Sequence, residues 1–310
     1  MLGARNLKRF KFFDLSQMEV MMKHAVVAQP SQYVDFWNTV LVPKFNQWRH
    51  VLVGGLGLHS ARVFPELNLK IGDSVLDVGC GWGETSIEIA RRVGPTGKVV
   101  GIDCCDGFLE AGRTDARRGG LSNVNFIEAD VEAYAFAPEF DFCFSRFGTQ
   151  FFQNPVAGLR SMRSALKPGG TMTMIAWRSR TDNPWLNLPR EIVLRHLPPV
   201  DAEAATCGPG PFSMADVEVV TKQLTAAGYS DLEFKRIDVD VMVGRSVEEA
   251  IAFQLAIGPA GEVYRNAGRE AERKREVLVH ALEDELHKFA RPEGVMMGSS
   301  SWIVTARNSS

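Results

Sequence analysis

Three aspartates that follow three apolar segments are the first residues that could do chemistry together: Asp77, Asp103 and Asp130. If these segments are parallel strands, the carboxylates meet at the carboxyl edge of one sheet, where open α/β sheets bind ligands. An acid after the second strand could accept hydrogen bonds from two ribose hydroxyls, and an acid after the third could accept one from an adenine amine. Three carboxylates would repel a pyrophosphate. The set therefore favours a nucleoside without phosphates.

A glycine-rich turn follows the first of these segments. Its spacing, Gly79-x-Gly81-x-Gly83, departs from the dinucleotide pattern G-x-G-x-x-G. Glycines let a ligand touch the backbone, and the helix that begins after the turn offers free N–H groups. The turn therefore adds a backbone contact surface beside the three acids.

The segments that must position these residues alternate between short apolar strands and helical stretches, which is typical of a parallel α/β sheet. We expect strands at 74–78, 99–102, 124–127, 140–144 and 171–177, and helices at 84–92, 108–118 and 156–166. This order places the turn and all three acids at strand ends.

The second half of the sequence has a looser pattern. Residues 178–212 are rich in proline and predict an irregular insertion. Two more strands are expected at 232–242 and 302–306, which makes seven in all. Between them, 262–289 predicts one long charged helix.

The composition excludes two classes of protein. The 310 residues carry 35 Lys+Arg and 37 Asp+Glu, so the formal net charge is -2. This balance argues against a partner held mainly through phosphate charge. No uncharged apolar run approaches the ~18 residues needed to cross a bilayer. We expect a cytoplasmic enzyme, although the basic residues before Asp14 leave a transit segment open beside a capping arm.

Five cysteines, Cys80, Cys104, Cys105, Cys143 and Cys207, are odd in number and show no CxxC spacing. Neither a disulfide framework nor a structural zinc site is expected, and no metal ligands are assigned. The vicinal pair Cys104-Cys105 admits a redox or arsenic-binding interpretation. Two small cysteines in a crowded turn are more often space-fillers.

Four motifs in order resemble those of the class I S-adenosylmethionine-dependent methyltransferases. The first, second and third motifs and the turn after the fourth helix correspond to Val75–Gly83, Val100–Asp103, Glu128–Asp130 and Leu166–Gly170. Phe140–Gly148 resembles the fourth strand of the subgroup related to the ubiquinone and menaquinone methyltransferases. The resemblance is strong over residues 33–177 and looser beyond them.

The resemblance implies a Rossmann-like, seven-stranded, mostly parallel sheet with helices on both faces, an N-terminal helical cap and helical lid insertions. The expected division is an N-terminal arm and cap at 1–60, a cofactor-binding core at 61–177, an irregular insertion at 178–212, and the rest of the core with a lid at 213–310. The lid itself would span about 243–298.

The cofactor that the resemblance implies is S-adenosylmethionine. The residues that would hold it are Trp37, Asp77, Gly79, Cys80, Gly81, Asp103, Cys104, Phe108, Asp130, Val131 and Ser145. The backbone of the two glycines would approach the methionine part, with Asp77 near its amino group. Ser145 would lie under the sulfonium.

At the adenosine end, the resemblance places Asp103 on the ribose and Asp130, with the Val131 backbone, on the adenine edge. Two alternatives stay open. Asp77 and Asp103 could only cap strand ends, and Glu128 or Glu132 could serve in place of Asp130.

An aromatic stretch precedes the core, and in the subgroup that it resembles it packs as a helix over the cofactor. Helical spacing puts Tyr33 and Trp37 on one face, with Phe36 beside them. Their rings could stabilise a sulfonium cation, at about 0.5–2 kcal/mol. Alternatively, Phe36 and Trp37 only anchor the helix to the core.

Two further residues are candidates for catalysis. His59 could be a general base or a core histidine. Arg146 follows Ser145 beside the expected methyl-transfer position. A guanidinium should not face a sulfonium, so it would hold a substrate carboxylate, phenolate or enolate. Otherwise it would pair with Asp141 or with an acid of the lid.

These features favour a methyltransferase that acts in-line on an O, C or S nucleophile of a small molecule, an acidic one if Arg146 holds it. The Asn/Asp-Pro-Pro-Tyr tetrapeptide of amino-methylating enzymes is replaced by Ser145–Gly148. The alternatives are transfer to nitrogen, a quinone-pathway C-methyltransferase, and a regulatory protein that binds S-adenosylmethionine without catalysis. We expect no nucleic acid or membrane partner and leave a homodimer open.

Overall fold

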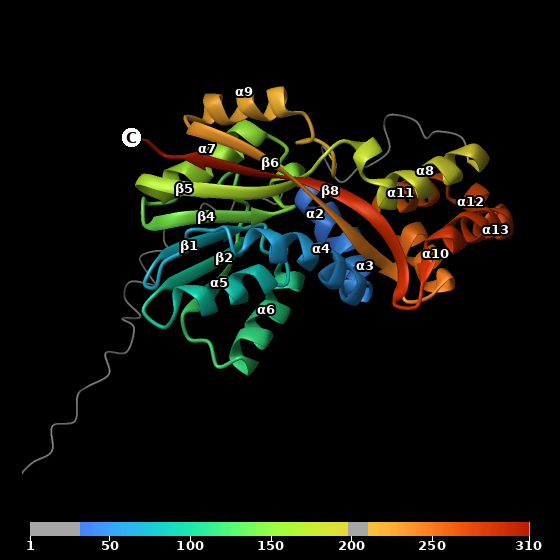
Figure 1. The fold of residues 1–310 in the computed structure, drawn as a ribbon, viewed down its shortest axis with the longest axis horizontal. Coiled ribbons are helices and arrows are strands. Elements are labelled where there is room, and N and C mark those ends of the chain that lie inside the picture. Colours follow the sequence, from blue (N-terminus) through green and yellow to red (C-terminus); the bar gives the residue numbers. More distant parts are fainter. Residues whose placement is uncertain (1–31, 198–209, 310) are drawn as a thin grey trace, which may run out of the picture. The chain divides into compact units, whose positions relative to one another are not determined.

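A computed structural model describes residues 32–197 and 210–309. The strands that it contains are β1 (Ser74–Val78), β2 (Lys98–Asp103), β3 (Val124–Glu128), β4 (Phe140–Arg146), β5 (Leu166–Trp177), β6 (Ser230–Gly244), β7 (Ala290–Arg291) and β8 (Gly294–Arg307). Seven of them follow one another in the order β3-β2-β1-β4-β5-β8-β6, and the two-residue β7 pairs with β8 beside this path. Figure 1 shows the sheet with helices above and below it.

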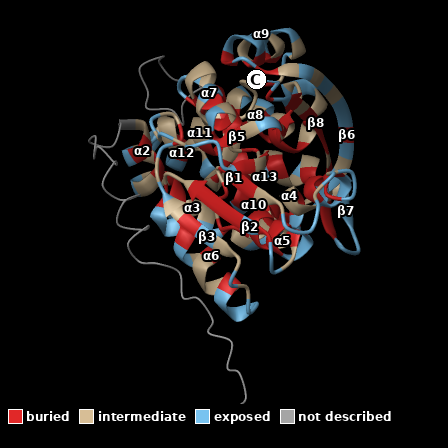
Figure 2. Cartoon of the chain, turned by 90° about the vertical axis from the view of Figure 1, so that its left-hand side faces the viewer, coloured by how far each residue is buried: buried red, intermediate tan, exposed pale blue. Residues whose placement is uncertain are grey.

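The first five strands run parallel, and β8 and β6 are antiparallel to their neighbours. Alternate side chains of β1 enter different cores: Val75 lies in one cluster with Ile89 of α5 (Glu84–Val93), and Leu76 in another with Leu159 of α7 (Pro155–Ala165). Because both faces of the central strands are covered, these strands are buried, as Figure 2 shows in red. The predicted fold class is confirmed.

Helices fill the two layers. One cluster includes α4 (Arg49–Val63) and α5, the other α7 and α9 (Val217–Ala227), while α6 (Asp106–Arg118) packs on β3. Asp216 caps α9 by accepting hydrogen bonds from two backbone N–H groups. None of the helices described is long and apolar enough to span a membrane.

The N-terminal part of the described chain forms a cap. It consists of α2 (Gln32–Phe36), the π-helical turn η1 (Trp37–Leu41), α3 (Val42–Gln47) and α4, which continues to Val63, beyond the expected boundary at residue 60. The expected arm at 1–31 lies outside the described residues.

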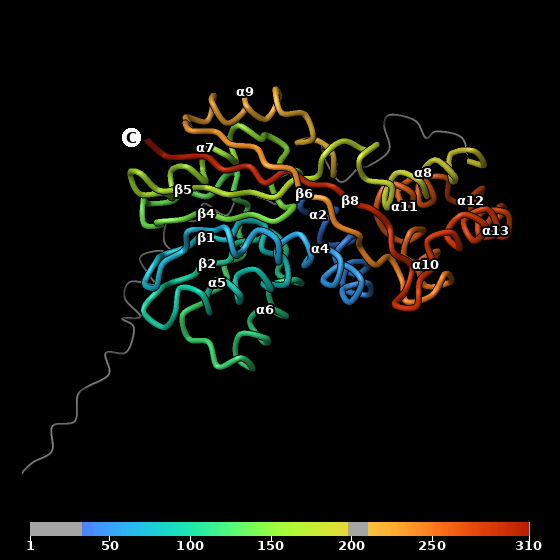
Figure 3. The backbone as a smooth tube through the Cα atoms, in the orientation of Figure 1, coloured from blue at the N-terminus to red at the C-terminus, as the bar shows by residue number. Residues whose placement is uncertain are grey.

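Strands β6 and β8 are longer than predicted and carry the lid. The pairing of β5 with β8 ends at Trp177 and Ser301, whereas β6 and β8 continue to pair as far as Gly244 and Val295. Figure 3 follows this extension away from the other strands to α10 (Val247–Ala256). The lid is therefore connected to the rest of the sheet by a two-stranded extension made of β6 and β8.

The prediction of one continuous lid helix at 262–289 is wrong. The structure breaks it into α11 (Gly258–Ala267), α12 (Arg269–Arg273) and α13 (Arg275–Leu286), followed by the short η4 (His287–Phe289). The first break is at Gly268, whose φ of 52° and ψ of -123° are not helical. Glycine adopts this backbone conformation without the penalty of a Cβ.

The insertion at 178–212 is not wholly irregular, because it contains the short η3 (Arg180–Asp182) and helix α8 (Pro184–His196). Pro184 occupies the first turn, where no N–H is needed. Pro189 lies inside the helix and cannot donate to the carbonyl of Trp185; the Gln254 side chain of α10 donates there instead, at 2.9 Å. Cys207 and the rest of 198–209 lie outside the described residues.

Candidate active site

A cavity of about 260 Å³ lies where the carboxyl ends of all five parallel strands meet. Its wall includes residues that follow β1, β2, β3 and β4, and Trp177 at the end of β5. The opposite wall comes from α2, η1, α3 and α4 of the cap and from α8 and α11. This is the ligand-binding edge expected for an open α/β sheet.

The glycine turn leaves a space beside the backbone at this edge. Gly79 and Gly81 have φ angles of 63° and 53°. A Cβ on Gly79 would lie 2.9 Å from the Cα of Gly148, so this position permits close packing of two loops. A Cβ on Gly81 would meet no atom within 4 Å. Gly81 therefore faces open cavity, and the backbone there is free to contact a ligand.

Asp103 is fixed at the centre of this wall. Its Oδ2 accepts a hydrogen bond from the Gly81 N–H at 2.9 Å, and its Oδ1 accepts one from the Cys105 N–H at 3.0 Å. Each carboxylate oxygen can accept a further hydrogen bond. Burial raises the pKa of Asp103 to about 6, against the opposing effect of these two N–H groups. The geometry fits a carboxylate that receives two vicinal hydroxyls.

Asp77 does not line the cavity, contrary to the expectation for the methionine end. It is 0% exposed, and its Oδ2 accepts from the hydroxyls of Thr85 and Ser86 at 2.7 and 2.6 Å. Its Oδ1 has no hydrogen-bond partner among the described residues. Burial raises its pKa to about 6. The alternation along β1 turns this side chain under α5, where it ties the helix to the strand.

Ser145 is also absent from the cavity wall. It is 0% exposed, and its hydroxyl donates to the Val78 carbonyl at 2.8 Å. It joins β4 to the end of β1 rather than facing the position expected for the sulfonium.

At the third strand end, Asp130 and Val131 both line the cavity. Asp130 is exposed, and its Oδ1 accepts from the Glu132 N–H at 2.9 Å. Glu132 is a weak alternative because its two oxygens accept from the backbone N–H groups of Gln153 and Asn154. Glu128 is not part of the wall. Asp130 remains the acid available to a ligand here.

The cap brings an aromatic group over the cavity. The Tyr33 hydroxyl donates to the Phe151 carbonyl at 2.6 Å, and the ring centroids of Trp37 and Phe151 are 5.0 Å apart. Tyr33 and Trp37 both line the cavity, as do Cys80, Cys104 and Phe108 of the expected cofactor set. Trp37 begins the π-helical turn, a distortion that is frequent at functional sites.

Arg146 reaches the cavity wall, and its partner is neither Asp141 nor an acid of the lid. Its Nη2 lies 3.4 Å from Glu84 Oε2, and its Nη1 donates to the Ser60 hydroxyl at 3.2 Å. Asp141 instead pairs with Lys167, at 2.7 Å. Glu84, at the start of α5, is the partner, a long-range pairing that the sequence did not indicate.

His59 is sealed inside the protein and does not line the cavity. Its Nε2 and Nδ1 lie 2.8 Å from the hydroxyls of Ser299 and Ser301. Since Ser299 donates its own proton to the Val239 carbonyl, it accepts from His59, and Nε2 carries a hydrogen. Burial, with the charge of Arg146, lowers the pKa of His59 to about 3. The structure therefore does not support a general base at His59.

Several wall residues were not foreseen: Glu84, Phe147, Phe151, Trp177, Trp185, Ile257, Pro259 and Arg265. Phe147 has a φ of 58°, a conformation that bulky residues rarely adopt, and its ring stacks on Trp177 with centroids 3.8 Å apart. Trp177 ends the fifth strand, so its position at the ligand edge could have been inferred. The residues of α8 and α11 carried no such signal.

Residues 75–170 match the family described as a methyltransferase domain. The ubiquinone/menaquinone biosynthesis C-methyltransferase of Pseudomonas putida is 34% identical over 142 residues, which are 45% of this chain and 56% of that relative. The chain thus spans little more than half the length of this curated relative.

Two solved structures share the fold. Phosphoethanolamine N-methyltransferase 2 of Haemonchus contortus, in complex with S-adenosyl-L-methionine, superposes with a TM-score of 0.54 at 16% identity, over 91% of this chain and 61% of that one. A Bacillus halodurans protein assigned as a methyltransferase has a TM-score of 0.51 at 18% identity, over 81% and 98%. The resemblance inferred from the motifs is confirmed: residues 75–170 match a methyltransferase domain, and the described chain shares its α/β fold with these two structures.

Proposed function

We propose that this chain is an S-adenosylmethionine-dependent methyltransferase that acts on a small molecule. The observation that carries the proposal is the open space beside Gly81, next to a carboxylate of Asp103 that two backbone N–H groups hold in place. In this proposal Asp103 binds the ribose and Asp130, with the Val131 backbone, binds the adenine edge. The proposed set of cofactor-binding residues omits Asp77 and Ser145, because Asp77 accepts from the hydroxyls of Thr85 and Ser86 and Ser145 donates to the Val78 carbonyl, both behind the cavity wall.

Bound S-adenosylmethionine would supply a methyl group on a sulfonium that is already a good leaving group. The chain's own task is then to align the acceptor and to exclude water, and alignment can contribute on the order of 7–11 kcal/mol in favourable cases. The rings of Tyr33 and Trp37 line the cavity from the cap and suit a cation better than an anion. The neutral, sealed His59 takes no part in proton transfer.

The acceptor side of the cavity favours an apolar small molecule. Trp177, Trp185 and Ile257 contribute apolar surface there, and Arg146, the last residue of β4, adds a cation to the wall. An anionic acceptor would have to take Arg146 from Glu84, whose contact with it is long at 3.4 Å. We keep an O, C or S acceptor as the leading proposal.

Two alternatives within the same chemistry remain. The curated relative is named as a quinone-pathway C-methyltransferase, and the solved neighbour from Haemonchus contortus as an N-methyltransferase. A third candidate, a regulatory protein that binds S-adenosylmethionine without transfer, keeps the same cavity.

The formal net charge of -2 supports a partner other than nucleic acid. We further propose a cytoplasmic location. Light scattering would measure the mass in solution and so decide between a monomer and a homodimer.

The experiment is transfer of a labelled methyl group from S-adenosylmethionine into a cell extract, followed by separation of small molecules from macromolecules. Label in the small-molecule fraction supports the proposal, and mass spectrometry of that product identifies the acceptor atom. Label in nucleic acid or protein overturns the acceptor class. Absence of label from a chain that binds the cofactor favours the regulatory protein. Asp103→Asn serves as the inactive control.

A further inference from the structure

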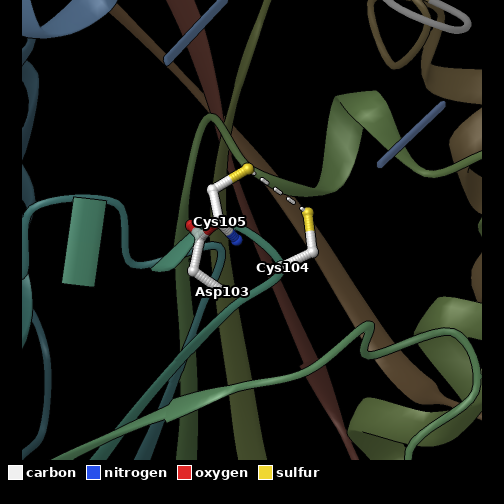
Figure 4. A group of neighbouring side chains, drawn as sticks. All are labelled: Asp103, Cys104 and Cys105. Carbon is white, nitrogen blue, oxygen red and sulfur yellow. Dashed lines mark hydrogen bonds between the residues drawn. The ribbon is translucent and has the colours of Figure 1, made fainter. Parts of the chain in front are cut away.

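Asp103, Cys104 and Cys105 form a cluster at the end of β2, on the wall of the cavity. Each offers one ligand atom, and these atoms lie within 4.8 Å of one another. The two sulfur atoms are 3.8 Å apart and face each other, as Figure 4 shows. No other group of His, Cys, Asp and Glu in the described part of the chain was found to converge in this way.

The spacing of the sulfurs matches that of two thiolates on one ion. Sulfurs that each lie about 2.3 Å from a tetrahedral ion are about 3.8 Å apart. An oxygen of the Asp103 carboxylate lies within 4.8 Å of both sulfurs and is the third candidate ligand atom. The cavity beside the cluster leaves a fourth position for water or another small ligand.

The cluster is held in this arrangement before any ion binds. Asp103 Oδ1 accepts from the Cys105 N–H at 3.0 Å, which folds the turn back on the carboxylate. The Asn38 side chain of the cap donates to the Cys104 carbonyl at 3.3 Å. Cys105 is the N-cap of α6 and has an extended backbone conformation, and its side chain makes no capping hydrogen bond to the helix. Ion binding would therefore order few additional groups.

Burial selects the kind of ion. Cys105 is 1% exposed, and an unpaired thiolate at such a position is costly. An ion that binds sulfur weakly, such as Mg²⁺ or Ca²⁺, prefers oxygen ligands and would not compensate this cost. Zn²⁺ and the softer Cd²⁺ bind thiolates strongly.

We propose that Cys104 and Cys105, together with Asp103, bind one thiophilic divalent cation of the Zn²⁺ and Cd²⁺ class, and that this ion excludes the cofactor. In the binding step, two S–H bonds break, two sulfur–metal bonds form, and two protons leave to solvent. The exclusion follows because Asp103 cannot ligate an ion and receive the ribose hydroxyls at once. This second half rests on the proposed function; the first half does not.

The first experiment titrates the reduced chain with Cd²⁺ alone and follows the thiolate-to-metal charge-transfer absorbance. We expect one equivalent to bind, with at least a tenfold loss of affinity in Cys104→Ser and in Cys105→Ser. The matched control is Cys143→Ala, in the buried centre of β4, which should bind as the wild type does. Thermal melts establish that each variant is folded. Wild-type affinity in both serine variants would overturn the site.

The second experiment compares binding of S-adenosylmethionine to the metal-free and the Cd²⁺-loaded chain by calorimetry. At least tenfold weaker binding to the loaded chain supports exclusion, and equal affinity overturns it. If the metal-free chain binds no S-adenosylmethionine, the proposed function fails, while the absorbance titration still decides whether the ion site exists. Zn²⁺, followed by competition against Cd²⁺, should give the same stoichiometry.

Discussion

The strand-end wall at residues 79–131 and the lid wall, formed by α11 of the lid together with α8 of the preceding insertion, face the same cavity but position their residues differently. On the strand-end wall the backbone sets the geometry: Gly81 and Cys105 donate their N–H groups to Asp103. On the lid wall, apolar packing dominates: Trp185 of α8 packs on Trp177 at the end of β5, with ring centroids 5.3 Å apart. The first wall should tolerate few substitutions, and the second should change specificity before it changes cofactor binding.

The largest effect is expected within the glycine turn. Gly79→Ala places a Cβ 2.9 Å from the Gly148 Cα at a φ of 63°, so it should lower the free energy of unfolding by about 2–4 kcal/mol. The matched control is Gly81→Ala, whose Cβ meets nothing within 4 Å. This substitution should lower the free energy of unfolding by only about 1–2 kcal/mol, and it should weaken binding of the cofactor instead. Urea denaturation of both proteins checks this, and equal losses of stability would contradict it.

Asp77 predicts a pH dependence of stability. Its pKa is raised from 3.8 to about 6 in the folded protein, so its stabilising contribution is full below pH 3.8 and is lost as the pH rises through 6. A shift of this size corresponds to on the order of 3 kcal/mol. Asp77→Asn cannot ionise, so its stability relative to the wild type should increase between pH 4 and pH 7. Denaturant midpoints across this range measure it, and a constant difference would refute the assignment.

For His59 we expect a pH dependence of stability with the opposite sign to that of Asp77. Its pKa is lowered from 6.5 to about 3, so its contribution is present above pH 6.5 and is lost as the pH falls. His59→Ala should cost about 1–3 kcal/mol of stability at neutral pH, because two buried hydroxyl contacts disappear. Methyl transfer per folded molecule should stay unchanged. The control is Arg62→Ala, at an exposed position on the same helix. A His59→Ala variant that folds but transfers no methyl group would show that His59 is a general base after all.

The smallest effect is expected on the lid wall. The Arg265 guanidinium of α11 lies 5.4 Å from the ring centroid of Phe36 and links the lid to the cap. Arg265→Gln should change stability by less than about 1 kcal/mol. It should alter the KM of the acceptor found by labelling while leaving the Kd of the cofactor unchanged. A change in cofactor Kd alone would break the distinction between the two walls.

The sequence predicted the strand-end wall well because its signals are local. An apolar segment followed by glycines or an acid predicts both a strand and the end of that strand that faces a ligand. Gly81, Asp103 and Asp130 were therefore expected at the ligand edge, and all three line the cavity. Asp77 and Ser145 were misplaced because side chains alternate along a strand, and both point into the packed interior.

The lid, helix α8 and the partner of Arg146 could not be predicted to the same depth, because their geometry depends on contacts between residues distant in sequence. The break at Gly268 was hidden within a continuous run of helix-forming residues. The pairing of Arg146 with Glu84 joins β4 to α5 at the cavity wall, and no sequence spacing indicates it. Pro189 suggested an irregular segment, whereas a side chain of α10 replaces the missing hydrogen bond.

The central claim is that Asp103 and the glycine turn bind S-adenosylmethionine, and calorimetric titration of the wild type and Asp103→Asn tests it most directly. We predict one site of micromolar affinity in the wild type and about 10–100-fold weaker binding in Asp103→Asn, since charge-assisted hydrogen bonds contribute about 1.5–3 kcal/mol. Asp106→Asn, exposed on α6, is the matched control and should bind as the wild type does. Absence of binding to the wild type, or equal affinity in Asp103→Asn, would contradict the claim.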